Sequence, residues 1–373
     1  MKILQISTEL VHSGAEKIVY DLSTNLKYKE HEVTVACVKD VRGEIGNWLE
    51  SKQIPVYWVD LNYRNPLKFI INIFKFVFWV RKEKFDLLHA HQFHANVIGR
   101  LAVFFSKSKL VSTVHLVERR FRPWHFWFDS LTAFLCKKEI CVSKAVKVFT
   151  EHKTSFMKKK LVVIYNGINS ISAKSENIDN LKSKLEMPKN KFIYGAVGRL
   201  NLQKGFCYLI DAFAEILKEI PDSYLFIVGE GVERQNLEAL IKKNSIGENV
   251  KLVGYSKDVH LYYQVMDGFI MPSLFEGFGL VAAEALMYEV PVVATNVDSL
   301  PEIIQHEKTG ILIDKQDIEA LTLKMKYLQE HQEKVLEWAR QGKSFIEENF
   351  SMENMINSHI DLYHSVMNIK SNT

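Results

Sequence analysis

The chain has 373 residues, of which 47% are hydrophobic and 25% are charged. These proportions are typical of globular domains, and the length suits two or three of them. The four cysteines form neither a CxxC pair nor a paired zinc-ligand spacing. This argues against a disulfide scaffold or a zinc finger and favours buried, reduced thiols.

The first residues, MKILQIST, read as a strand rather than a signal sequence, and no apolar run reaches the length of a membrane span. The net charge of +4 conceals an asymmetry, since residues 1–168 carry 27 Lys and Arg against 15 Asp and Glu, and residues 169–373 carry 21 against 29. The basic part favours a polyanionic partner, namely nucleic acid, anionic lipid or a diphosphate-bearing substrate. The alternative is a solvated charge bias without a partner.

Short apolar segments alternate with longer amphipathic stretches along the chain. In the first part, the expected strands are KILQIST, HEVTVACV, DLLHAH, KLVSTVH, EICVSK and LVVIYNG. In the second part, they are KFIYGAVGRL, SYLFIVGEG, VKLVGY, GFIMPS, PVVATNV and GILID. Apolar strands separated by helical patterns predict buried parallel sheets with crossover helices. Because the series occurs twice, the sequence predicts an α/β fold of two doubly wound domains.

The expected domains are residues 1–168 and 169–350. The polar stretch SISAKSENIDNLKSKLEMPK interrupts the strand rhythm after the first series. Residues 351–373 are amphipathic with no strand after them, so we expect a terminal helix that packs back toward the first domain. Ligands of open α/β sheets bind outside the carboxyl ends of the strands, where we therefore look for functional residues.

One such strand end reads PSLFEGFGLVAAEAL and carries Glu276 and Glu284. The expected helix begins near Gly279, where free amides and the positive dipole end favour an anionic group. Glu276 would face the ligand from the turn. Glu284 follows on the helix, where a carboxylate can accept two hydrogen bonds from a vicinal diol such as ribose. The alternative for Glu284 is a solvent-facing helical glutamate, although its apolar neighbours argue against that position.

Two cations follow another expected strand, in the stretch GAVGRLNLQKG. Arg199 lies just past the strand and Lys204 precedes a helix. A guanidinium and an ammonium at one strand end suit a diphosphate. The chain contains no Asp-x-Asp sequence for a metal, so these cations and a helix end would have to neutralise the diphosphate.

The first part of the chain offers a helix start and three histidines. Gly14 opens a helix where backbone amides can meet phosphate or sugar, but the glycines do not form G-x-G-x-x-G, which argues against NAD. His89 and His91 share one face of a strand, so both could reach the ligand-binding side, and His115 ends the next strand. A metal site is disfavoured because no acidic partner accompanies them at ligand spacing. The alternative for each histidine is a hydrogen-bonded core residue.

Two segments mix apolar and basic residues. Residues 67–80 are apolar except for Lys68, Asn72 and Lys75, and residues 118–128 combine arginines with tryptophans and phenylalanines. Aromatic and basic residues together suit a membrane interface or the acceptor. Stacking on single-stranded nucleic acid has no other support, and core packing is the alternative for residues 67–80.

Together these motifs resemble the retaining glycosyltransferases of family four, of the type that builds bacterial surface glycans. The resemblance runs along nearly the whole chain, through SGAE, DLLHAH, VSTVH, VSKAV, IYNGIN, GRLNLQKG, VGEG and the stretch from Glu276 to Glu284. It implies the GT-B fold, with two Rossmann-like domains facing across a cleft. The first would bind the acceptor and the second the nucleotide sugar.

The resemblance also implies roles for single residues. Arg199 and Lys204 would bind the donor diphosphate, Glu276 the donor sugar and Glu284 the ribose. The backbone of residues 278–280 (Phe278, Gly279 and Leu280) would meet sugar and phosphate, Gly14 would approach the phosphates from the other domain, and His115 would contact the transferred sugar. Ser13 stands where the family often has a second glycine, which puts the approach of that loop in question.

The implied activity is that of a hexosyltransferase-type enzyme. It would move a sugar from a nucleotide-diphosphate donor, with UDP favoured over GDP, to a glycan acceptor of lipid-linked or lipopolysaccharide type. Because the sequence offers no nucleophile, the resemblance favours front-face substitution without a metal or other cofactor. We expect a cytoplasmic protein peripheral to the inner face of the plasma membrane, with an anionic membrane surface and no nucleic acid among its partners. The alternatives are a catalytically silent GT-B subunit and a Rossmann-type epimerase or oxidoreductase.

Overall fold

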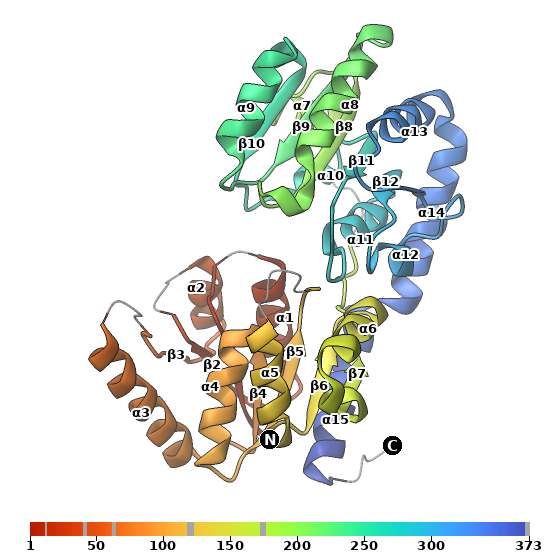
Figure 1. The fold of residues 1–373 in the computed structure, drawn as a ribbon. Helices are drawn as coiled ribbons and strands as arrows, with labels where there is room; N and C mark the ends of the chain where they lie inside the picture. Colours follow the sequence, from red (N-terminus) through yellow and green to blue (C-terminus); the bar gives the residue numbers. More distant parts are fainter. Residues whose placement is uncertain (12, 40–42, 62–64, 118–122, 172–176, 370–373) are drawn as a thin grey trace. The chain divides into compact units, whose positions relative to one another are not determined.

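The computed structural model describes residues 1–369 except 12, 40–42, 62–64, 118–122 and 172–176. The chain forms two compact units, which we call unit 1 and unit 2 (Figure 1). Unit 1 comprises Met1–Gly167 with the C-terminal segment from Met352, and unit 2 comprises Ile168–Ser351. The chain thus passes from one unit to the other within a residue of each boundary expected from the sequence.

Unit 1 is built on a seven-stranded sheet with the order β3-β2-β1-β4-β5-β6-β7. Its strands are β1 (Lys2–Ser7), β2 (Glu32–Cys37), β3 (Val56–Trp58), β4 (Leu87–His91), β5 (Lys109–Val114), β6 (Lys138–Cys141) and β7 (Leu161–Val163). Every pair of neighbouring strands described here runs parallel. Its helices are α1 (Gly14–Tyr28), α2 (Glu44–Ser51), α3 (Pro66–Glu83), α4 (Gln92–Phe104), α5 (Pro123–Thr132), α6 (Lys144–Lys153) and α15 (Met352–Met367).

Unit 2 has a six-stranded parallel sheet with the order β10-β9-β8-β11-β12-β13. Its strands are β8 (Phe192–Val197), β9 (Ser223–Val228), β10 (Val250–Gly254), β11 (Gly268–Met271), β12 (Val292–Thr295) and β13 (Ile311–Ile313). Its helices are α7 (Ile178–Lys184), α8 (Phe206–Glu219), α9 (Arg234–Lys243), α10 (Val259–Tyr263), α11 (Leu280–Met287), α12 (Leu300–Ile303), α13 (Ile318–Glu330) and α14 (Gln332–Asn349). Two parallel sheets with crossover helices confirm the predicted α/β fold class.

The strands form because apolar residues on both faces are covered by helices. In β1, Ile3, Leu4 and Ile6 have no exposed surface, and in β9, Leu225 and Ile227 have none. All twelve strands expected from apolar runs are present, whereas β3 was not expected. This strand has three half-buried residues at the edge of its sheet, which is too short for a hydrophobic pattern to develop.

Each sheet reverses its strand order once, between β1 and β4 in unit 1 and between β8 and β11 in unit 2. At such a reversal the connections leave toward opposite faces of the sheet, and the loops beyond the carboxyl ends leave room for a ligand. The polar residues that follow these strands are therefore the ones that the fold places for function.

Gly205 connects the two elements that follow β8. It lies between a 3₁₀ turn (Leu202–Lys204) and α8, with φ at 64°, and a Cβ there would lie 2.1 Å from the carbonyl oxygen of Pro272. Only glycine tolerates both the left-handed backbone and this close approach.

We expect Gly205→Ala to destabilise the protein by about 2 kcal/mol or more, because it adds left-handed strain to a steric clash. At this size, the melting temperature should fall by about 4 °C or more in calorimetry. Gly247→Ala is the matched control, since a Cβ at Gly247 meets nothing within 4 Å. Equal melting temperatures for the two variants would contradict the prediction.

Candidate active site

The strand-order reversal of unit 2 brings together most of the residues predicted for the donor site. Arg199 and Lys204 follow β8, and Glu276 follows β11, which pairs directly with β8. Because the strands are parallel, their carboxyl ends lie at one edge of the sheet. The sequence placed these residues at strand ends, and the topology makes those ends neighbours.

Lys204 and Glu276 form an ion pair in which Nζ lies 2.6 Å from Oε1. The side chains are 16% and 7% exposed, so the pair is largely withdrawn from water. Asn201 holds the turn by accepting the Lys204 backbone N–H, and the lysine side chain crosses over the backbone of Gly198. Arg199 is exposed and has no partner among the described residues. One cation is thus fixed, and the other is free to meet a ligand.

Glu276 is held on one carboxylate oxygen. The Ser273 hydroxyl donates to Oε1 over 2.8 Å, on the same oxygen that accepts from Lys204. The backbone N–H of Glu276 donates to Asp298 Oδ2 over 3.0 Å. Asp298 adopts a left-handed backbone with φ at 43°, which is unusual for a residue with a Cβ. No described residue bonds to Oε2, which leaves that oxygen available to a ligand.

The N-terminus of α11 lies directly after Glu276. Gly279 precedes the helix with φ at 98°, and a Cβ there would lie 2.6 Å from Leu300 Cδ2. The first N–H groups of a helix have no partner within it and attract anions. The side chain of Phe278 is buried against Phe350, so the backbone is the part of this residue that a ligand could meet.

Glu284, four residues into α11, is half-buried, and its Oε2 lies 3.0 Å from the hydroxyl of Tyr263. The solvent-facing alternative for Glu284 is therefore wrong. Sequence reasoning missed Tyr263, Ser273 and Asp298. Ser273 and Asp298 lie at strand ends and could have been found there, whereas no local pattern marks Tyr263.

In unit 1, α1 begins at Gly14 as expected, after Ser13. Ser13 has φ at −150°, an extended conformation that any residue adopts, so serine in place of glycine causes no backbone strain. Its hydroxyl donates to the buried carboxylate of Glu16, which also accepts from Gln92 Nε2 over 3.0 Å. Glu16 therefore ties the start of α1 to the start of α4.

The expectation that His89 and His91 reach the ligand-binding side is wrong. Both are buried, with 0% and 1% exposure, and Tyr363 and His359 of α15 pack against His89. His89 bonds to Tyr363 of α15 and to Thr113 of β5, each over 2.7 Å. His91 bonds to Gln5 over 2.8 Å and to His115 over 2.9 Å. The alternative reading, hydrogen-bonded core residues, is the one that these two histidines follow.

The bond to Gln5 determines which ring nitrogen of His91 and of His115 carries the proton. Gln5 Oε1 can only accept, so Nε2 of His91 carries the proton and Nδ1 accepts from Nε2 of His115. His115, which is half-buried, therefore turns the unprotonated Nδ1 away from the network. Burial lowers the pKa of His115 to about 3, so its ring stays neutral at ordinary pH.

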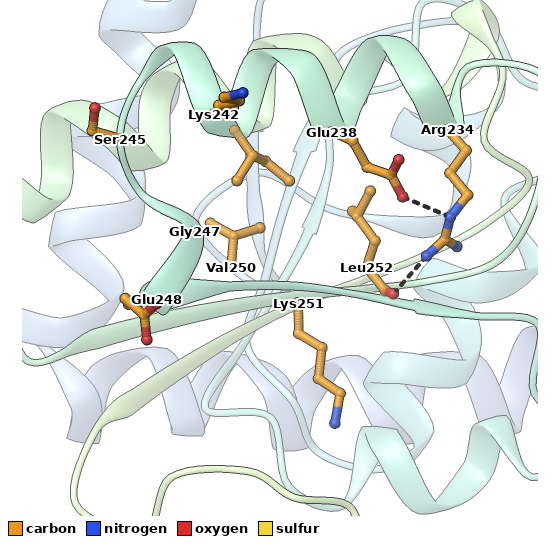
Figure 2. Close-up of a pocket in the computed structure, with 10 residues that line it drawn as sticks. Arg234, Glu238, Lys242, Ser245, Gly247, Glu248, Val250, Lys251 and Leu252 are labelled. Atoms are coloured by element: carbon orange, nitrogen blue, oxygen red, sulfur yellow. Dashed lines mark hydrogen bonds and ion pairs between the residues drawn. The ribbon is translucent and has the colours of Figure 1, made fainter.

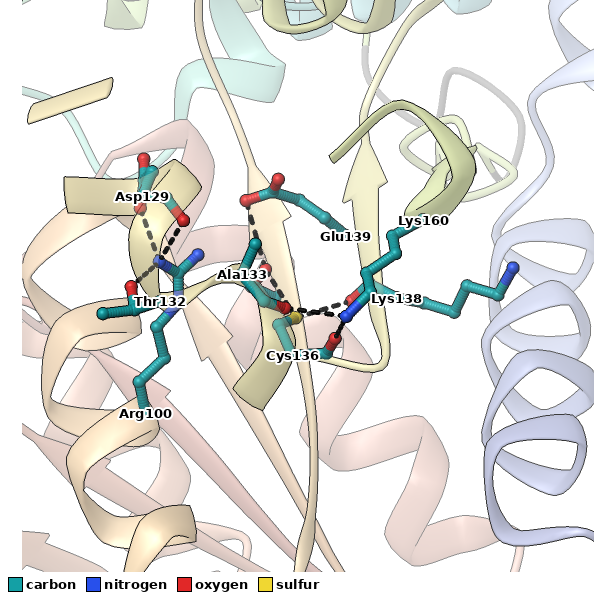
Figure 3. Close-up of polar contacts among 9 residues, drawn as sticks. Arg100, Asp129, Thr132, Ala133, Cys136, Lys138, Glu139 and Lys160 are labelled. Carbon is teal, nitrogen blue, oxygen red and sulfur yellow. Dashed lines mark hydrogen bonds and ion pairs between the residues drawn. The ribbon is translucent and has the colours of Figure 1, made fainter. Parts of the chain in front are cut away.

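A second buried polar cluster lies under α5 (Figure 3). Arg100 is 2% exposed and pairs with Asp129 over 3.0 Å, while Lys160 Nζ donates to the carbonyl oxygens of Ala133 and Cys136. Burial raises the pKa of Glu139 to about 7, an effect that Asp129 reinforces and Arg100 opposes. These groups bond mainly to one another and to backbone, which indicates a structural role.

Figure 2 shows a hollow between α9 and β10, at the edge of the sheet of unit 2. Two of its charged residues pair with each other, since Arg234 bonds to Glu238 over 2.9 Å, and Arg234 also bonds to the carbonyl oxygen of Leu252 over 3.3 Å. None of the predicted site residues lines it. The candidate site is therefore the end of β8 and β11, not this hollow.

Two family models match the chain, one to each series of strands. The model described as Glycosyltransferase Family 4 matches residues 12–170, and the model described as Glycosyl transferases group 1 matches residues 177–345. Between them they cover all of the predicted site residues.

Several known proteins are similar over most of their length. The UDP-Gal:alpha-D-GlcNAc-diphosphoundecaprenol alpha-1,3-galactosyltransferase of Escherichia coli is 24% identical over 336 residues, 86% of each chain. The alpha-monoglucosyldiacylglycerol synthase of Acholeplasma laidlawii is 26% identical over 330 residues, 82% of each chain. The crystal structure of Anabaena Alr3699/HepE in complex with UDP and glucose superposes with a TM-score of 0.89 at 23% identity, over 98% of this chain and 100% of that one. This likeness confirms the two-domain fold expected for a GT-B protein.

The buried histidines should make the stability of unit 1 depend on pH. Burial lowers the pKa of His359, on α15, to about 4, so below pH 6.5 the unfolded chain binds a proton that the folded protein does not. The free energy of unfolding should therefore fall by up to about 1.4 kcal/mol per pH unit between pH 6.5 and 4. In His359→Gln this titration is absent, so between pH 7 and pH 5 the variant should lose about 2 kcal/mol less stability than the wild type in urea unfolding.

Glu139 changes the free energy of unfolding in the opposite direction. Its raised pKa stabilises the folded state at low pH, and this stabilisation is lost as the pH rises through about 7. It is present in both proteins and cancels in the comparison. Identical losses in the variant and the wild type between pH 7 and pH 5 would contradict the prediction.

Proposed function

The chain belongs to family four of the glycosyltransferases, and we propose that it transfers a hexose from a UDP-sugar to a glycan acceptor with retention at the anomeric carbon. The observation that carries this proposal is the group of residues at the ends of β8 and β11. They comprise the exposed guanidinium of Arg199, the ammonium of Lys204 that Glu276 holds, and the carboxylate of Glu276, which bonds through one oxygen. The start of α11 follows directly after Glu276.

The proposed roles follow from charge. Arg199, Lys204 and the first amides of α11 neutralise the diphosphate as it leaves, in place of a metal ion. Lys204 is already oriented by Glu276, so little reorganisation is needed when charge develops on the leaving group. A donor diphosphate would share the ammonium with Glu276, whose free Oε2 is positioned for a hydroxyl of the donor sugar.

The proposed reaction is a front-face substitution, because no described side chain stands as an evident nucleophile. The acceptor hydroxyl enters on the side from which the diphosphate departs, and the departing phosphate takes its proton. Catalysis is then mostly positioning and stabilisation of negative charge. Gly14 and His115 of unit 1 remain predicted contacts of the phosphates and the transferred sugar, the latter through the unprotonated Nδ1.

Similar proteins support the choice of donor and acceptor. The Anabaena protein was crystallised with UDP and glucose, and the Escherichia coli relative is named for UDP-Gal and a diphosphoundecaprenol acceptor. The Acholeplasma laidlawii relative is named for a glycolipid. We therefore propose a UDP-hexose as donor and a lipid-linked glycan as acceptor.

We expect UDP to raise the melting temperature of the protein. With the UDP-hexose that gives the largest shift, Arg199→Ala should lower the rate of UDP release by about a hundredfold or more, since one such contact contributes about 3 kcal/mol to the transition state. Lys204→Ala should have a similar effect and also lower stability, because it leaves the buried carboxylate of Glu276 unpaired.

Lys218→Ala is the matched control, since this exposed lysine pairs only with Glu215 on α8. Its rate should equal that of the wild type. Near-normal turnover of Arg199→Ala would refute the diphosphate contact. Activity lost in EDTA and restored by manganese would refute metal independence.

A lipid-linked acceptor requires the protein to reach a membrane, and α3 suits that purpose. Phe76, Val77 and Val80 are buried in unit 1, as the core-packing alternative expects. A second apolar stripe on the same helix is exposed and consists of Leu67, Ile70, Ile71, Phe74 and Phe78. In the described ranges, no helix is long and apolar enough to cross a membrane. An exposed apolar stripe on a surface helix indicates a docking face.

The basic residues around this stripe favour binding to an anionic bilayer. Lys75, Arg81 and Lys82 are exposed on α3, and Lys68 pairs with Asp60 over 2.5 Å. Asn72 bonds to the carbonyl oxygen of Asp60, so the predicted polar stripe partly anchors α3 to the loop after β3. Basic residues beside apolar ones combine electrostatic attraction with insertion. We therefore propose that α3 docks on anionic lipid at the cytoplasmic face of the membrane.

A second exposed apolar group lies on the helices next in the chain. Its members are Leu101, Phe104 and Phe105 at the end of α4, and Trp127, Leu131 and Phe134 on and after α5. Of the segment 118–128 that was predicted to touch a membrane or the acceptor, residues 118–122 lie outside the described residues. The exposed Trp127 suits a membrane interface, where tryptophan combines an apolar ring with a polar N–H.

Replacing Phe74 and Phe78 with serine should weaken binding to liposomes that contain phosphatidylglycerol. Two phenylalanines withdrawn from a bilayer reduce the partition coefficient by at least about tenfold. Flotation measures the bound fraction. Leu323→Ser, an exposed apolar residue of unit 2, is the control and should float like the wild type. Equal flotation of the double variant and the control would contradict the proposed face.

A further inference from the structure

Tyr263 ends the short helix α10 and is 2% exposed. Its hydroxyl lies 3.0 Å from Oε2 of Glu284 and 3.3 Å from the carbonyl oxygen of Val281, both on α11. A hydroxyl has one proton to donate, and the carboxylate is both the nearer and the stronger acceptor. A residue from a different helix thus supplies a hydrogen bond to the carboxylate of Glu284.

The ring of Tyr263 is fixed by packing on its faces. It stacks on Tyr288 with 5.5 Å between ring centroids and 16° between planes, and it lies tilted against Phe269 of β11 at 5.9 Å. Burial, with the charge of Glu284 beside it, raises the pKa of the hydroxyl well above its ordinary value. The hydroxyl therefore stays protonated and keeps its direction at any pH at which the protein works.

We propose that Tyr263 is a positioning residue that fixes the carboxylate of Glu284 for recognition of the ribose of the nucleotide. This inference rests on the proposed function, in which Glu284 accepts from the ribose hydroxyls. An ionised carboxylate offers about four acceptor positions, and Tyr263 uses one of them. Enough remain for both hydroxyls of a ribose diol.

The hydrogen bond acts by preventing rotation of the carboxylate. Without the tyrosine hydroxyl, the half-buried Glu284 loses one of the bonds that hold its last torsion, so its carboxylate is less ordered in the free protein and must gain that order when the nucleotide binds. Ordering one flexible side chain on binding lowers affinity by about threefold to tenfold. The loss concerns only nucleotides that reach Glu284 with a hydroxyl, which separates this role from a general effect on packing.

The test compares UDP with 2′,3′-dideoxy-UDP, which lacks both hydroxyls of the diol, by isothermal titration calorimetry. The wild type should prefer UDP. Tyr263→Phe keeps the ring and its stacking but removes the hydroxyl, so its affinity for UDP should fall about threefold to tenfold while its affinity for 2′,3′-dideoxy-UDP stays nearly constant. Tyr262→Phe is the matched control, because the neighbouring ring lies against Phe226 and should give wild-type values for both nucleotides.

A double variant checks that Tyr263 acts through Glu284. In a Glu284→Gln background, Tyr263→Phe should change UDP affinity much less than in the wild type. Unchanged binding of 2′,3′-dideoxy-UDP also shows that the single variant is folded. Equal losses for both nucleotides, or full discrimination retained in Tyr263→Phe, would overturn the positioning role.

Failure of the proposed function gives a different result. If the wild type binds neither UDP nor GDP, the nucleotide-sugar proposal fails, and the inference fails with it. If the wild type binds only GDP, the same comparison is made with GDP and 2′,3′-dideoxy-GDP. If it binds the ribose and dideoxyribose forms equally, Glu284 does not bind the ribose hydroxyls, and only the inference fails.

Discussion

The ion pair between Lys204 and Glu276 is the interaction on which the candidate site depends. It joins the loops after the two central strands of unit 2, at 2.6 Å and largely out of water. Withdrawing two charges from water costs several kcal/mol for each ion, which a pair recovers only when its geometry is good and further hydrogen bonds complete it. Ser273 and Asp298 supply those bonds to Glu276, on the side chain and the backbone respectively. The polar residues of three loops therefore form one connected cluster rather than independent surface groups.

The parts of this arrangement that follow from local pattern could be predicted from the sequence. Buried parallel strands are apolar along their whole length, so the number of strands and their positions along the chain could be predicted, except for the three-residue β3. Parallel pairing gathers carboxyl ends at one edge, and this rule located Arg199, Lys204 and Glu276. The rule does not say how deep a side chain lies. His89 and His91 obey the alternation of β4, with ring centroids 4.1 Å apart, yet both are covered.

Partners that are distant in the chain could not be predicted. His89 bonds to Tyr363, which lies 274 positions away, and Tyr263 reaches Glu284 from another helix. Neither contact leaves a periodic signal, because each depends on how finished elements pack. The same holds for α3, whose composition indicated an apolar helix but not that five of its large apolar residues stay exposed. Tertiary packing decides which of the two apolar stripes of α3 is buried in the core of unit 1.

Unit 1 is assembled from both ends of the chain. Tyr363 and His359 of α15 are buried in it beside the histidines of β4, although the whole of unit 2 is synthesised in between. On the ribosome, unit 2 has all of its sequence before unit 1 does. The amino-terminal part of unit 1, made first, therefore keeps the surface around His89 uncovered until α15 has been synthesised.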